Sequence, residues 1–269
     1  MPWQLIIAGA FTLALLVAAA ASAVEDQTAI IVPSRIKAFQ PGETLTYSIS
    51  WSSLVTAGIV TTEVQGDRLP DGREGIVFAV TGRTKGVLDA MFPVYDTVRS
   101  LFDPQSMVNL TYRLTESYGK KKRRREMVFD HSNNTVLSRL NDDKPETLAV
   151  PENTLDGLSM LYVLRMREDF REGKIFTLPV HDSSKNWSVE IHTLGRERVT
   201  TPAGEFSTIK IETHPTYRGV FLNKGVVFIW LTDDARKIPV LAKGSLKVGS
   251  FVFTLTSIKS QVSRNEAAP

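Results

Sequence analysis

A single amphipathic helix stands in a chain whose other patterned segments favour strands, and this contrast limits the possible folds more than any other feature. Apolar side chains recur at spacings of three and four within residues 153–167: Leu155, Leu158, Tyr162 and Met166. Asn153 or Thr154 is expected to cap the first turn of this helix. An apolar helix face must be covered, and the expected cover is a sheet.

The strand signal is clearest in Glu43 to Trp51, where apolar residues alternate with Thr and Ser. Similar segments follow at near-hairpin spacing: 59–64, 76–82, 94–101, 107–117, 120–129, 136–140 and 147–150 before the helix, and 175–180, 187–194, 197–201, 206–213, 226–231, 238–243 and 251–258 after it. So many short strands predict a mainly β fold, a large antiparallel curved sheet or barrel-like β domain with one inserted helix.

The N-terminus indicates export. Met1 to Ala23 contains no charged side chain, and its apolar run ends in Ala21-Ser22-Ala23. This pattern predicts a signal peptide over 1–23, cleaved near Ala23, because the run is short for a membrane span. The missing Lys or Arg leaves a retained anchor as the alternative. We expect a lead-in over 24–38, a single β-rich domain over 39–258 and a polar tail over 259–269.

Composition excludes several classes of function. The absence of cysteine rules out disulfides, thiol catalysis and thiolate metal sites. With 32 basic and 29 acidic residues the chain is not polycationic, so we expect no nucleic-acid partner. The four histidines, His131, His181, His192 and His214, show no metal-ligand spacing, and nucleotide-binding loops are missing from the sequence. We therefore expect no metal and no cofactor.

Polar residues recur every three positions along the predicted helix: Asp156, Ser159, Tyr162 and Arg165. They form a stripe that could line a ligand-binding cleft between helix and sheet. The alternative is that they are buried groups that cap the helix and bond the sheet. A second candidate set for ligand binding follows a later strand: Trp230, Asp233 and Arg236. The plainer interpretation of this second set is a hairpin turn with an Asx cap.

Six consecutive cations form the sharpest local anomaly: Lys120, Lys121, Lys122, Arg123, Arg124 and Arg125. Side chains of a strand alternate between its faces, so such a run cannot pack a core on either side, and we expect the segment to protrude. It is interpreted either as a solvated hairpin whose charge prevents edge pairing or as a contact with an anionic membrane surface or phosphorylated glycolipid.

Several short signatures, in order and at matching spacing, resemble a bacterial envelope family of unknown function, DUF3108. They are Phe39-Gln40-Pro41-Gly42-Glu43, Ala57-Gly58, Phe129-Asp130, the helix stripe, Thr201-Pro202-Ala203-Gly204, Trp230-Leu231-Thr232-Asp233-Asp234, Ile238-Pro239-Val240 and Gly249-Ser250. The resemblance covers about Phe39 to Ile258. It implies an exported β-rich domain, expected in the periplasm, and it supplies no catalytic residues.

Three functions remain open at this stage. The leading hypothesis is a non-enzymatic protein that binds or chaperones an amphipathic envelope component, a lipid or glycolipid, in an apolar space under the helix. The second is a structural or assembly factor for an envelope protein or glycan, which would use an exposed sheet edge. The third is a hydrolase of envelope polymers with paired carboxylates such as Glu197 and Glu205.

Overall fold

The computed structural model describes residues 36–51, 55–182, 184–217, 220–221, 226–245 and 250–260. Outside the described residues lie the predicted signal peptide, the lead-in up to residue 35 and the polar tail from residue 261. Within the described part of the chain, no helix is long and apolar enough to span a membrane.

The described strands join into one antiparallel sheet, which confirms the predicted fold class. The strands before the main helix are β1 (Thr44–Trp51), β2 (Val55–Arg68), β3 (Glu74–Thr84), β4 (Val94–Asp103), β5 (Val108–Tyr118), β6 (Lys121–Asp130), β7 (Thr135–Leu140) and β8 (Glu146–Ala149). Those after it are β9 (Ile175–Asp182), β10 (Lys185–Thr201), β11 (Gly204–Tyr217), β12 (Val220–Phe221), β13 (Val227–Thr232), β14 (Pro239–Ser245) and β15 (Ser250–Lys259). The helices are α2 (Val87–Met91) and α3 (Gly157–Met166).

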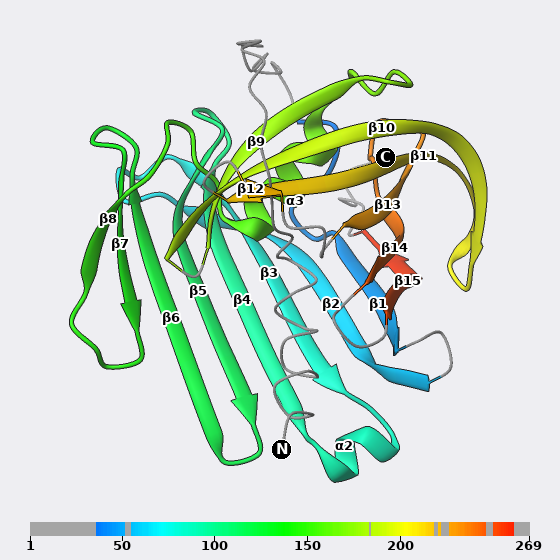
Figure 1. Cartoon of the computed structure of the whole chain (residues 1–269), viewed down its shortest axis with the longest axis horizontal. Helices are drawn as coiled ribbons and strands as arrows, with labels where there is room; N and C mark the ends of the chain where they lie inside the picture. Colours follow the sequence, from blue (N-terminus) through cyan, green and yellow to red (C-terminus); the bar gives the residue numbers. More distant parts are fainter. Residues whose placement is uncertain are drawn as a thin grey trace, which may run out of the picture.

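The order of the strands places the ends of the sheet at β8 and β9. The sheet runs β8-β7-β6-β5-β4-β3-β2-β1-β15-β14-β13-β11-β10-β9, with β12 paired to β11 beside this path. It curls strongly, and the long β10 and β11 bend back above the broad face of β2 to β7 (Figure 1). The described residues form no ladder between β8 and β9, so the barrel is not closed.

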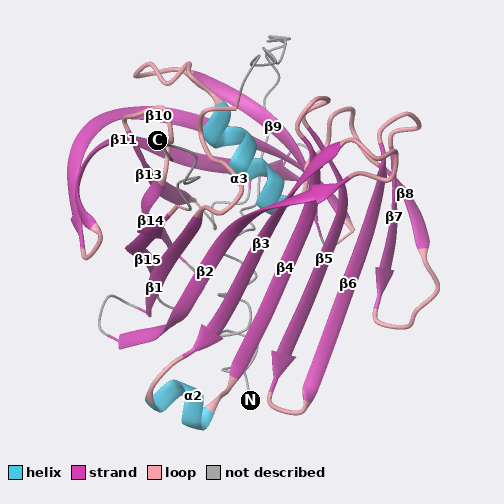
Figure 2. Cartoon of the chain, turned by 180° about the vertical axis from the view of Figure 1, so that it is seen from behind, coloured by secondary structure: helices cyan, strands magenta, loops and turns pink. Residues whose placement is uncertain are grey.

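Helix α3 follows one edge strand and precedes the other, and it lies inside the curl (Figure 2). The residue that leads into it, Leu155, pairs with the β9 edge: its N–H donates to Pro179 O at 2.9 Å, and its carbonyl accepts from His181 N at 2.8 Å. Exposed backbone groups on an edge strand need partners. Through Leu155, the chain before α3 therefore supplies β9 with some of the backbone hydrogen bonds that a neighbouring strand would make.

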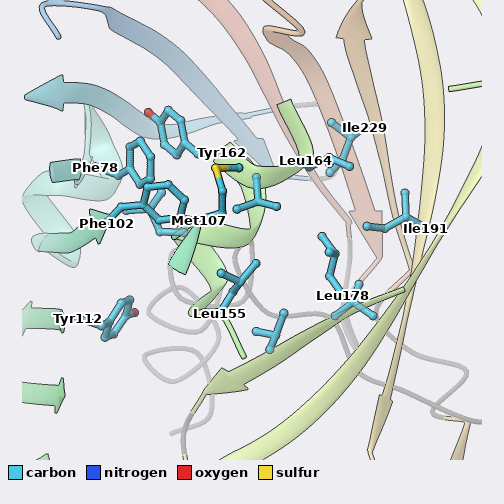
Figure 3. Packing of buried hydrophobic residues seen from close by; sticks show 14 of the residues in the cluster. Phe78, Phe102, Met107, Tyr112, Leu155, Tyr162, Leu164, Leu178, Ile191 and Ile229 are labelled. Atoms are coloured by element: carbon cyan, nitrogen blue, oxygen red, sulfur yellow. The ribbon is translucent and has the colours of Figure 1, made fainter. Parts of the chain in front are cut away.

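The core lies on both sides of α3. On one side, the Tyr162 ring stacks on Phe78 with centroids 3.8 Å apart and planes 3° apart, next to Phe102. On the other side, Leu164 lies toward Leu178, Ile191 and Ile229 (Figure 3). These side chains are buried. The helix therefore fills the space between the two halves of the curled sheet, which do not pack directly on each other there.

The helix starts later than the sequence predicted. Asp156, not Asn153 or Thr154, is the N-cap, with φ −81° and ψ 165° and a side chain that accepts from two helix N–H groups. Asn153 has a φ of 53°, and the Thr154 hydroxyl donates to Pro151 O at 2.6 Å. An N-cap residue has an extended backbone, so the left-handed conformation of Asn153 excludes Asn153 as the cap. Thr154 comes too early, because the residue after it, Leu155, still pairs with the edge of β9 and the helix begins beyond it.

Two further differences concern β10 and α2. The predicted strands 187–194 and 197–201 are one strand, because the register between β10 and β11 shifts at Thr193/Gly195 and the chain continues through a bulge. Gly195 has a φ of 146°, which a side chain would disfavour. The short helix α2, which was not predicted, connects β3 to β4.

The prediction that the basic run protrudes is wrong in part. Lys121 to Arg125 belong to β6 and pair with β5, whereas the ladder between β6 and β7 begins at Arg125. Arg125 is only 6 % exposed. The cations of the run from Lys120 to Arg124 are exposed because they lie at the end of β6 and in the β5–β6 turn.

Candidate functional site

Helix α3 covers only part of the inner face of strands β2 to β5. The register of these strands aligns their inward residues in rows. The first row is Val60, Gly82, Asp96 and Glu116; the second is Thr62, Val80, Val98 and Leu114; the third is Val64, Phe78, Ser100 and Tyr112. Contacts of α3 with Phe78 and Ser100 fall on the third row. The first two rows are therefore available to line a cavity.

A pocket lies beside the helix at this place. Its wall comes from β1 to β5, from α3 and from β13 to β15, and includes Val60, Val80, Val98 and Leu114 of the first two rows. The centres of water molecules can occupy about 130 Å³ of this pocket. The whole empty space between the lining residues, including the part that is open to solvent, is about 1050 Å³. The lining is predominantly apolar, which is the usual character of a small-molecule site.

Arg165 fixes the C-terminal half of α3 to the sheet. Its guanidinium donates to both carboxylate oxygens of Glu43, at 2.7 and 2.9 Å, and to Ala38 O at 2.8 Å and Arg236 O at 3.1 Å. Arg165 is 1 % exposed and Glu43 6 %. A buried ion pair is tolerable only when its remaining donors are also satisfied, as they are here. Arg165 also lines the pocket, with its charge already balanced.

Asp156 fixes the other end of the helix. One carboxylate oxygen accepts from the N–H groups of Leu158 and Ser159, each at 2.9 Å. The second accepts from the hydroxyls of Ser100 at 2.6 Å and Ser159 at 2.8 Å. Burial raises the pKa of Asp156, and these hydrogen bonds oppose the rise. Asp156 and Ser159 therefore bond the helix to β4, and neither lines the pocket.

Tyr162 and Arg165 are the residues of the predicted stripe that reach the pocket wall. The second predicted set does not line the pocket. Trp230 packs in an apolar cluster that also contains Leu45, Tyr47 and Val60 of the pocket wall, and it donates its indole N–H to Glu197. Asp233 pairs with Arg196 at 2.7 Å, and the Arg236 guanidinium pairs with Asp234 at 2.6 Å. The backbone carbonyl of Arg236 accepts the hydrogen bond from Arg165. A role of these residues in ligand binding stays a prediction.

Asp96 and Glu116 were not among the predicted site residues; they face each other across β4 and β5 on the inner side of the sheet. Glu116 is 1 % exposed and pairs with Arg123 at 3.2 Å. Asp96 lines the pocket, accepts from Ser117 N at 3.2 Å through Oδ1, and within the described residues its Oδ2 has no hydrogen-bond partner. Both residues stand at positions of β4 and β5 where the period-two alternation predicts an apolar, inward side chain. A carboxylate at such a position could have been recognised in the sequence.

Asp96 is a titratable group of the pocket wall whose pKa is shifted into the neutral range. Burial raises its pKa to about 7, the Ser117 N–H opposes the rise, and the negative charge of Glu116 adds to it. The carboxyl therefore changes its ionisation near neutral pH, where an ordinary aspartate is fully ionised.

The acids considered for hydrolysis have partners of their own. Glu197 lies 3.4 Å from Lys210 and accepts from Trp230, and the indole hydrogen bond holds the Glu197 pKa below its usual range. Glu205 pairs with Arg198 at 3.0 Å. Over the part of the chain that the structure describes, no group of three or more His, Asp or Glu side chains is arranged to hold a metal ion.

The end of the sheet near the first row carries basic and apolar side chains together. The turn between β5 and β6 touches the segment after α2, since Gly119 N donates to Pro93 O at 3.1 Å. Met91 is 62 % exposed and Tyr95 52 %, and both lie at this end. We call the exposed cations of this turn and of the start of β6, Lys120, Lys121 and Lys122, together with Met91 and Tyr95, the rim. Figure 1 shows α2 and the hairpin of β5 and β6 at the same end of the sheet.

Comparison with known proteins extends the sequence analysis. A family model described as protein of unknown function (DUF3108) matches residues 46–256. A search of curated proteins found no significant match. Among solved structures, the chain is similar to a beta-barrel-like protein of the domain of unknown function DUF1849 from Brucella abortus, with a TM-score of 0.55 and 11 % identity over 82 % of this chain and 98 % of the other.

A second solved structure, a protein with a YmcC-like fold from Bacteroides fragilis, matches with a TM-score of 0.38 and 14 % identity over 82 % of this chain and 97 % of the other. This score is too low to define a common fold. The match to the Brucella protein supports the barrel-like architecture and, at its low identity, nothing about activity.

Breaking the Arg165–Glu43 pair should destabilise the fold strongly. Arg165→Met leaves a buried carboxylate without its partner, so we expect the free energy of unfolding to fall by about 3–5 kcal/mol. The double variant Arg165→Met/Glu43→Leu should recover part of this loss. Urea unfolding measures both, with Arg198→Met as the control, because the exposed Arg198–Glu205 pair should cost about 1 kcal/mol or less. Equal losses at the two arginines would contradict this role.

Asp96 should make stability depend on pH. Its pKa is about 7 in the folded protein against 3.8 for an ordinary aspartate, so the stability it contributes is complete below about pH 4 and is lost as pH rises through 7. From pH 5 to pH 8, wild type should lose on the order of 2 kcal/mol relative to Asp96→Asn. Urea unfolding at both pH values tests this; Glu63→Gln should follow wild type. Parallel curves for wild type and Asp96→Asn would refute the raised pKa.

Proposed function

The chain belongs to the DUF3108 family of proteins of unknown function, and we propose that it binds the aliphatic part of an amphipathic envelope molecule, a lipid or glycolipid, in the pocket beside α3. The family assignment confirms the resemblance found in the sequence. We further propose that the chain acts after export, in the periplasm, as the apolar segment ending at Ala23 predicts.

The observation that carries this proposal is the apolar wall of the pocket. Its first two rows present Val60, Val80, Val98 and Leu114, and α3 adds Leu158 and Leu161. Transferring an aliphatic chain from water to such a wall gains roughly 0.8 kcal/mol for each buried CH₂ group. A pocket of this character needs no catalytic group to be useful, which favours binding or transport of an apolar molecule over hydrolysis.

The rim suggests where such a molecule enters. Exposed cations attract an anionic membrane surface, and exposed aromatic and apolar side chains insert at the interface. Lys120, Lys121 and Lys122 lie beside Met91 and Tyr95 at the end of the sheet nearest the first row. We propose that this end contacts an anionic membrane, so that a lipid passes a short distance from bilayer to pocket.

Filling the pocket should weaken the binding of apolar ligands. Val80 lies in the second row, so Val80→Trp places an indole inside, whereas Thr81→Trp on the outer face of the same strand leaves the pocket unchanged. We expect wild type to bind the neutral fluorophore N-phenyl-1-naphthylamine and dodecanol to displace it. Val80→Trp should weaken binding about ten-fold or more, equivalent to about 1.4 kcal/mol.

Thr81→Trp is the matched control and should bind as wild type does. Far-ultraviolet circular dichroism and thermal unfolding verify that both variants fold. Unchanged probe binding by a folded Val80→Trp protein, or failure of wild type to bind any apolar probe, would reject the pocket as the ligand site.

Neutralising the rim cations should weaken membrane contact. The variant Lys120→Gln/Lys121→Gln/Lys122→Gln is expected to bind phosphatidylglycerol vesicles less well than wild type at low salt, since each cation near an anionic surface contributes about 1 kcal/mol. Vesicle cosedimentation measures this. The control Arg68→Gln/Lys144→Gln/Arg171→Gln removes the same charge from other exposed positions. Equal binding by the two triple variants would show that the rim cations contribute no more to membrane binding than other exposed cations do.

A further inference from the structure

One carboxylate of the pocket wall carries a charge that no neighbouring cation balances. Arg165 is neutralised by Glu43 through two hydrogen bonds, and Glu116 is paired with Arg123. Asp96 forms no ion pair within the described residues. Arg125 is buried on β6 opposite Leu114 of the second row, but it does not affect the pKa of Asp96, so no described cation balances Asp96 when it is ionised.

The second oxygen of Asp96 has no hydrogen-bond partner within the described residues. The residue is 6 % exposed, its Oδ1 accepts from Ser117 N, and its Oδ2 is buried. Gly82 stands opposite Asp96 on β3 and also lines the pocket. Because glycine has no side chain, nothing from that position covers the carboxylate. A buried polar atom without a partner costs stability, so a retained one calls for an explanation.

Resting on the proposed function, we infer that the pocket takes a primary ammonium group carried on an aliphatic chain, with Asp96 as its carboxylate partner. The aliphatic chain lies against the second row and α3, and the ammonium lies in the first row. The shared chemistry is that of a long-chain amine or of a lipid whose head group bears a primary amine.

Alternative head groups fit less well. A phosphate or carboxylate would be repelled by Asp96 and by Glu116 across the ladder. A hydroxyl could donate to Oδ2 but would leave the negative charge unbalanced in a buried place. An ammonium donates a charge-assisted hydrogen bond and also neutralises the carboxylate. The pKa of Asp96, raised to about 7, agrees with a carboxyl that lacks a cation in the unliganded protein.

The test compares three ligands with the same chain length and different head groups. Dodecylammonium, dodecanol and dodecanoate each displace N-phenyl-1-naphthylamine from the full chain at pH 8. Wild type should bind dodecylammonium about ten-fold or more tightly than dodecanol, because a hydrogen bond to a charged group is worth that factor or more. Asp96→Asn should remove this preference and leave dodecanol binding unchanged. Glu63→Gln, which removes a carboxylate from the outer face of β2, should keep the preference.

The outcomes separate the inference from the proposed function. Equal binding of dodecanol and dodecylammonium by wild type, or a preference retained in Asp96→Asn, overturns the ammonium assignment and leaves the apolar pocket intact. Failure of all three ligands to bind overturns both. Incubation with phosphatidylethanolamine or phosphatidylglycerol vesicles, followed by native mass spectrometry, distinguishes the sources. Selective uptake of phosphatidylethanolamine indicates an amine-bearing lipid; dodecylammonium binding without lipid uptake indicates a simple amine.

Discussion

The structure depends on the two buried polar anchors that hold α3 inside the curled sheet. Arg165 binds Glu43 of the segment that leads into β1, and Asp156 joins the first turn of the helix to Ser100 of β4. Each anchor is satisfied by several hydrogen bonds, because a buried charge without them would destabilise the fold. Together they fix both the position of the helix along the sheet and its rotation, which apolar packing alone specifies weakly.

The pocket is a consequence of where these anchors place the helix. Ser100 and Phe78 lie in the third row of inward residues, so α3 covers that row and leaves the two rows toward the rim to form a wall. A helix anchored nearer the rim would fill the same space with its own side chains. The polar contacts thus support function indirectly, by holding open an apolar volume, and Asp96 in the first row gives that volume a polar end.

Much of the fold follows from local sequence pattern, and much of the site does not. Period-two alternation identified nearly every strand, and the helix spacing identified α3, because both signals belong to single segments. The partners of Asp156 and Arg165 were not predictable, since Ser100 and Glu43 are 56 and 122 residues away. Arg125 was misjudged for the same reason, because β5 and β7 pair with β6 on both sides at this residue and bury it; the pairing of the exposed Arg123 with Glu116 is likewise a property of the ladder.

The central claim is that the pocket holds an amphipathic molecule, and the most direct measurement is native mass spectrometry of the protein purified gently from its own envelope. Our account predicts a complex with one lipid or glycolipid, which denaturation releases and chemical analysis identifies by its aliphatic chain. A protein that is recovered bare, and that also takes up no lipid when lipid is added back, would contradict it.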